Sequence, residues 1–167
     1  MNRNIFEKGN INWNSVDILN ELDNFISLYE QRPIKDNKGG MLFAQMFFFY
    51  FILKKIKPEF VIESGIYKGQ STWLIENTLQ DCEIFAIDID LSQREYISKK
   101  ANYSSKDFKF HDFSNISKNS LVFFDDHQNA LERLKQCKKY GFKNIIYEDN
   151  YASELGDNYS FKKILDN

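Results

Sequence analysis

Two helices are predicted from the hydrophobic pattern of the first third of the chain. Apolar residues recur at helical spacing over 15–30, which indicates an amphipathic helix; they are Val16, Leu19, Leu22, Phe25 or Ile26, and Tyr29. The segment 31–40 holds Pro33 and a pair of glycines and is interpreted as a loop. The run 41–53 is the most apolar of the chain, yet shorter than the roughly 20 apolar residues that span a membrane. We therefore expect 41–53 to form a buried helix and the protein to have no membrane partner.

Beyond Pro58, short apolar runs alternate with helical patterns. Strands are expected at 59–63, 83–90, 107–110, 120–126 and 143–150, and helices at 70–79, 92–101, 128–140 and 158–167. This alternation predicts an α/β fold, with a Rossmann-like parallel sheet covered by helices on both faces. No sixth or seventh strand is expected after the last run.

Three of these helices have recognisable ends or faces. The helix 70–79 opens with hydroxyl residues able to cap it. Ser92 and Glu95 have the spacing of a capping box, which predicts that a helix starts there. Gly141 is expected to stop the helix 128–140, whose apolar face is predicted to consist of Ala130, Leu131, Leu134 and Cys137.

Composition and charge narrow the class of protein. A chain of 167 residues fits one domain, in which we expect N-terminal helices over 1–57 to pack on a ligand-binding unit over 58–167. The net charge of −2, without a block of one sign, argues against nucleic acid as the main partner. Cys82 and Cys137 match no zinc spacing, which favours a reducing, cytoplasmic location.

Polar residues gather where the expected strands end. In a parallel sheet these ends share one edge, where ligands bind near the switch in strand order. We therefore expect a single site assembled from four strands. Its candidate residues are Glu63, Asp88, Asp125, Asp126, Glu148, Asp149 and Asn150.

The first strand runs into a glycine turn, in the sequence VIESGIYKGQST over 61–72. The turn is neither G-x-G-x-x-G nor a phosphate-binding loop, and Glu63 at its mouth would repel a phosphate. Glu63 suits a cationic ligand instead, such as the amino or sulfonium group of S-adenosylmethionine. Gly65 and Gly69 allow close approach of the backbone. Asp88, 25 positions after Glu63, is placed to accept both hydroxyls of a ribose.

These motifs resemble those of the class I S-adenosylmethionine-dependent methyltransferases, and more narrowly of the metal-dependent group typified by catechol O-methyltransferase. The resemblance covers roughly 58–151 and rests on ESGIYKGQS, AIDID, FFDDH and YEDN in that order. It implies that the methionine end of the cofactor meets the glycine turn, that Asp88 binds the ribose, and that His127 and Asp112 lie at the adenine, with Phe113 able to stack on the ring. The turn residues implied are Glu63, Gly65, Tyr67, Gly69 and Ser71.

The resemblance also implies a magnesium site formed by Asp126, Asp149 and Asn150. Two carboxylates and an amide oxygen form a hard oxygen site that suits Mg²⁺. Asp125 competes with Asp126 for the ligand role, because neighbouring strand residues point to opposite faces. The adjacent histidine favours Asp126. Glu148 is a candidate further ligand.

Together these features predict metal-assisted O-methylation of a small hydroxylated substrate, a sugar or a phenol. The chain departs from the catechol enzyme at Asn129, where that enzyme has a lysine, and the last two strands of the full sheet are missing. The alternatives are a non-catalytic or truncated binding protein with the same fold and a nicotinamide-dependent oxidoreductase. An exposed edge at 145–148 is expected to be buried by self-association, by the C-terminal segment or by a missing continuation, and we favour self-association into a homo-oligomer.

Overall fold

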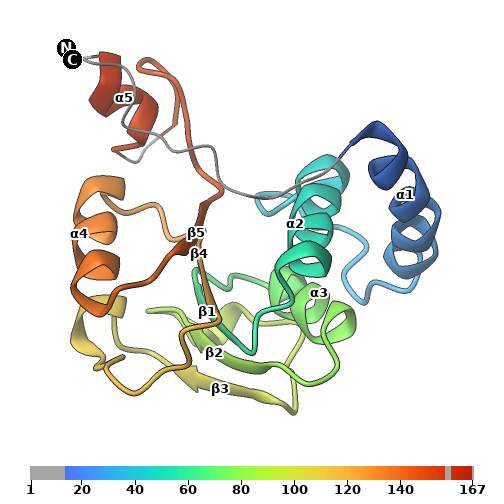
Figure 1. Cartoon of the computed structure of the whole chain (residues 1–167), viewed down its shortest axis with the longest axis horizontal. Helices are drawn as coiled ribbons and strands as arrows, with labels where there is room; N and C mark the ends of the chain where they lie inside the picture. The colour runs from blue at the N-terminus through green and yellow to red at the C-terminus, as the bar shows by residue number, and fades with distance from the viewer. Residues whose placement is uncertain (1–13, 157–158, 167) are drawn as a thin grey trace.

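The computed structural model describes residues 14–156 and 159–166, and its centre is a parallel sheet of five strands (Figure 1). The strand order is β3-β2-β1-β4-β5, so the chain reverses direction across the sheet between β1 and β4. The strands are β1 (Phe60–Ser64), β2 (Glu83–Ile87), β3 (Ala101–Ser104), β4 (Ser120–Phe124) and β5 (Asn144–Tyr147). This confirms the predicted α/β, Rossmann-like class, and the described part of the chain contains no sixth strand.

The register of the sheet places the strand ends level with one another. Ser64 pairs with Ile87 on one side and with Phe124 on the other, and Phe124 pairs with Tyr147. The residues that follow these four are Gly65, Asp88, Asp125 and Glu148. The glycine turn and the acidic strand ends therefore meet at one edge, as the sequence predicted.

Helices cover both faces of the sheet (Figure 1). One face packs against α2 (Phe43–Ile56) and α3 (Gln70–Thr78), with α1 (Ser15–Tyr29) packed on α2. The other face packs against α4 (Ala130–Tyr140) and the short 3-10 turn η2 (Phe108–Phe110). Alternate residues of β1 serve the two faces: Val61 packs with the first group and Ile62 with the second. This alternation continues past the strand ends and determines the geometry of the site.

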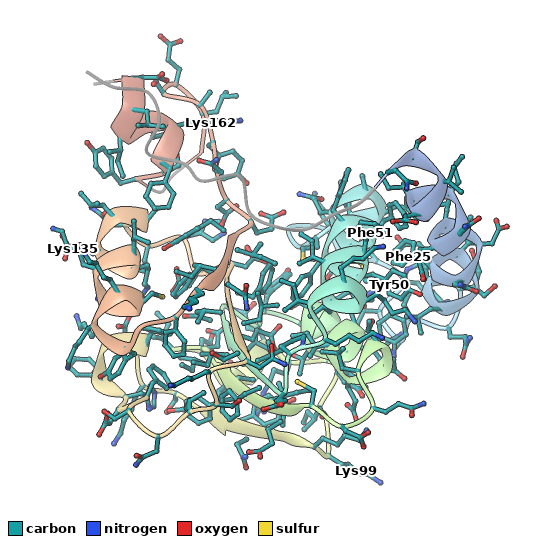
Figure 2. The ribbon with its side chains drawn as sticks, in the orientation of Figure 1. Phe25, Tyr50, Phe51, Lys99, Lys135 and Lys162 are labelled. Atoms are coloured by element: carbon teal, nitrogen blue, oxygen red, sulfur yellow. The ribbon has the colours of Figure 1, made fainter. Side chains whose placement is uncertain are left out.

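The apolar run 41–53 forms the buried helix α2, as predicted. Phe49 stacks on Phe123 of β4 with 4.1 Å between ring centroids, and Phe25 of α1 packs against Tyr50 (Figure 2). In the described residues, no helix combines the length and the apolar character needed to cross a bilayer.

The predicted helix over 92–101 is wrong. Only a single 3-10 turn forms, η1 (Leu91–Gln93), because Asp90 caps it by accepting from the Ser92 amide at 3.0 Å. Glu95 pairs with Lys68 at 2.8 Å instead of closing a capping box. The third strand is also misplaced in the prediction, since β3 lies at 101–104 and 107–110 contains η2.

Two predicted apolar faces and one predicted cap also need correction. Val16 and Leu19 of α1 are exposed, whereas Phe25 is fully buried. On α4, Leu134 is exposed and Arg133 is buried. The hydroxyls at the start of α3 make no capping bond to the helix. The end of α4 at Gly141 and the C-terminal helix α5 (Phe161–Asp166) agree with the prediction.

Candidate functional site

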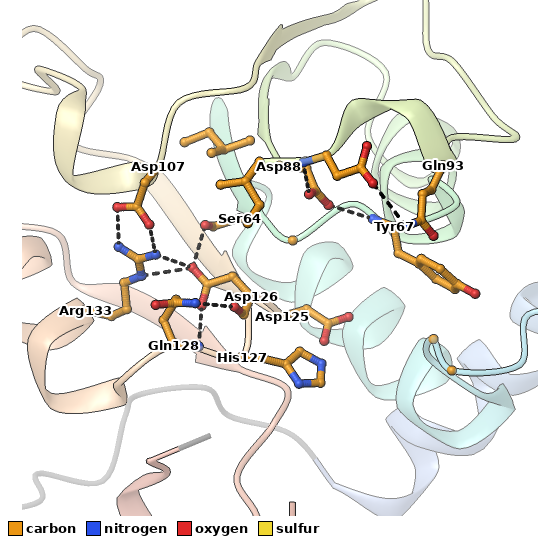
Figure 3. Close-up of a pocket in the computed structure, with 16 residues that line it drawn as sticks. Ser64, Tyr67, Asp88, Gln93, Asp107, Asp125, Asp126, His127, Gln128 and Arg133 are labelled. Carbon is orange, nitrogen blue, oxygen red and sulfur yellow. Dashed lines mark hydrogen bonds and ion pairs between the residues drawn. The ribbon is translucent and has the colours of Figure 1, made fainter. Parts of the chain in front are cut away.

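A cavity of about 270 Å³ lies at the carboxyl edge of the sheet (Figure 3). The ends of β1, β2 and β4 line it together with the loop before α2 and the first turns of α4. Five carboxylates stand in its wall: Asp88, Asp90, Asp107, Asp125 and Asp126. The cationic side chain in the wall, Arg133, is already bonded to two of them. The charge of this cavity therefore disfavours a phosphate group.

Asp88 lines the cavity and also fixes the glycine turn. Its Oδ2 accepts from the backbone amides of Ile66 and Tyr67 at 2.8 and 2.9 Å, and its Oδ1 accepts from the Asp90 amide at 2.9 Å. Because three backbone bonds hold the carboxylate, its position is set before any ligand arrives.

The two glycines of the turn are required by close backbone contacts. Gly65 has φ +95°, and a Cβ there would lie 2.0 Å from the carbonyl oxygen of Asp125. Gly69 has φ +94°, and a Cβ there would lie 2.5 Å from the carbonyl oxygen of Tyr96. Gly65 lines the cavity with Tyr67, whereas Gly69 begins α3. The turn thus packs β1 directly against the loop that follows β4.

Glu63 lies behind the cavity, fully buried. The Thr72 hydroxyl, at the start of α3, donates a hydrogen bond to the Glu63 carboxylate at 2.6 Å. Burial raises the pKa of Glu63 to about 7, although the Ser71 and Thr72 hydroxyls oppose that shift. Ser71 contacts a smaller hollow beside the main cavity, which Tyr67 and Asp125 share.

Asp125 and Asp126 leave β4 on opposite faces (Figure 3). Asp126 accepts from the Ser64 hydroxyl at 2.7 Å and from Arg133 Nε at 2.9 Å, on the α4 side. Asp125 interacts electrostatically with Glu63, Glu148 and Asp149 instead. The strand pleat separates two neighbouring acids in this way.

Three side chains could hold a metal ion, namely Asp125, His127 and Asp149. They offer ligand atoms that all lie within 4.8 Å of one another, and His127 Nε2 is 3.2 Å from Asp149 Oδ2. Burial and the neighbouring Glu148 and Asp149 raise the pKa of Asp125 to about 9. Burial and Asp149 raise the pKa of Glu148 to about 7. A concentration of carboxylates of this kind favours the arrival of a cation.

The predicted metal ligands are only partly brought together. Asp149 is in the cluster, but Asp126 is bonded to Arg133 and Asn150 accepts from the Lys162 amide at 3.1 Å in α5. Asp126 was predicted as the metal ligand because a histidine follows it. In the structure, the alternation of side chains along the strand places Asp125, not Asp126, on the side of Glu148. His127, expected at the adenine, lines the cavity and also faces Asp149.

Two further predicted positions, Asp112 and Phe113, and Asn129, where the catechol enzyme has a lysine, lie away from the cavity wall. Asp112 is exposed and accepts from the Ser114 hydroxyl at 2.5 Å, and Phe113 is buried among Phe108 and other rings of the core. Asn129 caps α4 by accepting from the amides of Leu131 and Glu132.

Arg133 is the residue that sequence reasoning missed. Because α4 carries many other charged residues that lie on the surface, the sequence did not indicate that this side chain is buried. In the structure, Arg133 is only 4% exposed. It bonds to both carboxylate oxygens of Asp107, at 3.1 and 2.8 Å, and to Asp126.

No family model and no curated protein matches this sequence. The chain is similar to solved structures of CmcI with SAH, at 18% identity and TM-score 0.57 over 83% of this chain and 77% of that one, and of apo CmcI, at 16% and 0.53 over 87% and 69%. It is also similar to the SAH-bound Podospora anserina methyltransferase PaMTH1, at 14% and 0.58 over 88% and 76%. These likenesses confirm the fold that the sequence motifs predicted.

Proposed function

We propose that this protein binds S-adenosylmethionine at the carboxyl edge of its sheet and transfers its methyl group. The observation that carries the proposal is Asp88, a carboxylate fixed by three backbone amides in the wall of a cavity of about 270 Å³. A carboxylate at this strand end is placed to accept both hydroxyls of a ribose. The similar structures of CmcI and PaMTH1, described with SAH, support the same ligand class.

The acidic wall suits the rest of this cofactor. S-adenosylmethionine carries a sulfonium and an amino group, both cationic, and no phosphate. Gly65 and Tyr67 line the cavity beside Asp125, which supports a place there for the methionine end. Glu63 is buried behind the turn, so we propose that its ionised form, which prevails above its pKa of about 7, acts on the cofactor through charge rather than by contact. Ser71 and Gly69 would complete and shape this end of the site.

We further propose that a divalent cation binds at Asp125, His127 and Asp149. Two carboxylates suit Mg²⁺ or Mn²⁺, and an imidazole extends the choice to later transition metals. Bound there, the cation would lower the pKa of a substrate hydroxyl. The carboxylate of Glu148 lies next to this cluster.

The reaction that fits this arrangement is O-methylation. The bond between sulfur and the methyl carbon breaks, a bond from the acceptor oxygen to that carbon forms, and the sulfonium becomes a neutral thioether. The hydroxyl proton must leave to a base. Glu148 is our candidate, because its carboxylate lies beside the cluster and is not one of the three proposed ligands. The acceptor class that we propose is a small sugar or phenol.

A non-catalytic binding protein is the second candidate. It is favoured by Asn129, which caps α4 where the catechol enzyme has its lysine. A nicotinamide-dependent oxidoreductase is less well supported, since the acidic wall disfavours a pyrophosphate. Fluorescence on adding NADH would detect that ligand.

For the location, we propose the cytoplasm, because Cys82 and Cys137 are both free thiols.

Calorimetry with S-adenosylmethionine and SAH tests the proposed function. Wild-type protein should bind, and Asp88→Ala should lose two charge-assisted hydrogen bonds, which costs about 2–3 kcal/mol or roughly 30- to 150-fold in affinity. Asp81→Ala is the matched control, because Asp81 is an exposed acid before β2, at the opposite edge of the sheet. Wild-type protein that gives no heat of binding at millimolar cofactor would refute the proposal.

A further inference from the structure

The strongest unexplained feature beside the site is the buried guanidinium of Arg133. Its three nitrogens donate four hydrogen bonds. Nε donates to Asp126 at 2.9 Å, Nη1 to Asp107 at 3.1 Å and to Gln136 at 3.0 Å, and Nη2 to Asp107 at 2.8 Å. Nη2 also forms an ion pair with Asp126 at 2.9 Å. Its Cζ atom also lies 5.6 and 5.7 Å from the ring centroids of Phe108 and Phe124. Each of the three nitrogens of Arg133 is therefore already engaged by the protein itself.

This guanidinium joins four separate parts of the fold. It belongs to α4, Asp107 precedes η2, and Asp126 lies in the loop after β4. Asp126 in turn accepts from Ser64, the last residue of β1. Figure 3 shows this chain of bonds along one wall of the cavity.

The loop from Asp125 to Gln128 is held by contacts on both of its sides. His127 adopts φ +52°, a conformation uncommon for a residue other than glycine. Within the loop, the Gln128 amide reaches Asp126 Oδ1 only at 3.3 Å. The contacts with the rest of the fold include those of Asp126 to Ser64 and Arg133, the Asp125 amide to the Ser64 carbonyl at 2.8 Å, and His127 Nε2 to Asp149 at 3.2 Å. Asp126 is therefore one anchor of this loop, on its α4 side.

We propose that Arg133, supported by Asp107, is a positioning residue that sets the shape of the loop 125–128. By holding Asp126 on the α4 side, it directs Asp125 and His127 toward Asp149. It also neutralises the one acid of the pair that the proposed cation site does not use. The predicted effect on cation affinity rests on the proposed function. The predicted effect on the position of the loop 125–128 does not depend on that function.

Arg133→Lys tests this role, because lysine keeps a buried positive charge but loses the planar fork that reaches two carboxylates at once. We expect the affinity for Mn²⁺, measured by calorimetry, to fall by about tenfold. Lys135→Gln is the control: it removes one positive charge from the outer side of α4, where Lys135 points away from the site (Figure 2), and should leave the affinity unchanged.

A second readout needs no ligand. The chain has two histidines, so the ring signals of His127 and His111 can be resolved by NMR and assigned with a His111→Gln variant. Arg133→Lys should shift the His127 signal, and Lys135→Gln should not. If Arg133→Lys does not fold, Asp107→Asn, which leaves the bonds between Arg133 and Asp126 in place, should shift it in the same direction by less.

The outcomes separate this inference from the proposed function. The positioning role is overturned if Arg133→Lys folds, binds Mn²⁺ within twofold of the wild-type affinity and leaves the His127 signal unmoved. If Arg133→Lys cannot be made, an unmoved His127 signal in Asp107→Asn overturns it. Wild-type protein that binds no Mn²⁺ overturns the proposed cation site, and the His127 signal then decides the role of Arg133 by itself.

Discussion

At the scale of single residues, the pleat of β4 divides two adjacent acids between two tasks. Asp126 faces α4 and balances the charge of Arg133, whereas Asp125 faces Asp149 and Glu148. Neither role is visible in the residue type, since both are aspartates. The side of the strand on which each one leaves decides it.

Paired substitutions can distinguish these tasks. Asp125→Asn should replace a carboxylate that can ionise on metal binding by a neutral amide, in the cluster with His127 and Asp149, and abolish Mn²⁺ binding at micromolar concentration. Asp126→Asn should weaken that binding less, but lower the melting temperature more, because it leaves part of the charge of buried Arg133 without a partner. Calorimetry and thermal unfolding of the two variants provide the comparison. A reversed order would assign the cation to Asp126.

Glu63 should make stability depend on pH. Its carboxyl has a pKa of about 7 in the folded protein, against 4.5 without the effects of burial. Between these values the unfolded chain binds fewer protons than the folded one, so the free energy of unfolding falls as the pH rises. The loss levels off above pH 7 at about 3 kcal/mol.

Thermal melts of wild type and Glu63→Gln at pH 5.5 and pH 8 would measure this effect. Glutamine has the same size and can still accept from Thr72. The wild type should lose several degrees more than the variant between the two pH values, at about 2–4 °C per kcal/mol. Equal losses would mean that Glu63 does not titrate in this window.

At the scale of elements, the glycine turn after β1 packs closely against the loop after β4. Gly65 lets the turn touch the backbone of Asp125, and Asp88 holds the turn by two amides. A shift of the turn should therefore also move the proposed cation cluster, although the two come from distant parts of the sequence.

Gly65→Ala tests this unit, with Gly141→Ala as its control. Both glycines have positive φ, +95° and +75°, so both substitutions strain the backbone by roughly 1 kcal/mol. An added Cβ meets nothing within 4 Å at Gly141 but lies 2.0 Å from the Asp125 carbonyl at Gly65. Gly65→Ala should therefore cost about 3 kcal/mol or more by chemical denaturation and weaken Mn²⁺ binding. Equal costs at the two positions would contradict the close contact.

The sequence predicted most elements of this fold because their signals are local. The apolar run of α2 and the alternation of strands and helices from β1 to β5 need no knowledge of tertiary contacts. The helix expected at Ser92 failed because its apparent capping pair has stronger partners elsewhere, Asp90 and Lys68. Arg133 and the choice of Asp125 depend on which face of a helix or strand is turned inward, and a single residue's identity does not encode that.

At the scale of the whole molecule, the sheet ends at β5 within the described residues. β5 pairs with β4 on one side, and Glu148 donates its amide to Phe124. By the alternation of a parallel ladder, the amides of Ile145 and Tyr147 then face away from β4. Tyr151, Leu155, Tyr159 and Leu165, which follow this strand, are all exposed.

We predict that two copies associate through this edge, because among the described residues β5 has a neighbouring strand on one side only. Light scattering at micromolar concentration should give a mass above the 19.9 kDa of one chain. Hydrogen exchange at Ile145 and Tyr147 should slow as the protein concentration rises. A mass of one chain at every concentration would refute this prediction.

A crystal structure with SAH and Mn²⁺ tests the central claim most directly, that the carboxyl edge of this sheet holds a methyl donor beside a cation. The ribose hydroxyls should lie on Asp88, and the anomalous signal of the metal should appear among Asp125, His127 and Asp149. Clear density for SAH elsewhere, or an empty cavity at saturating SAH with no metal signal in the cluster, would contradict it.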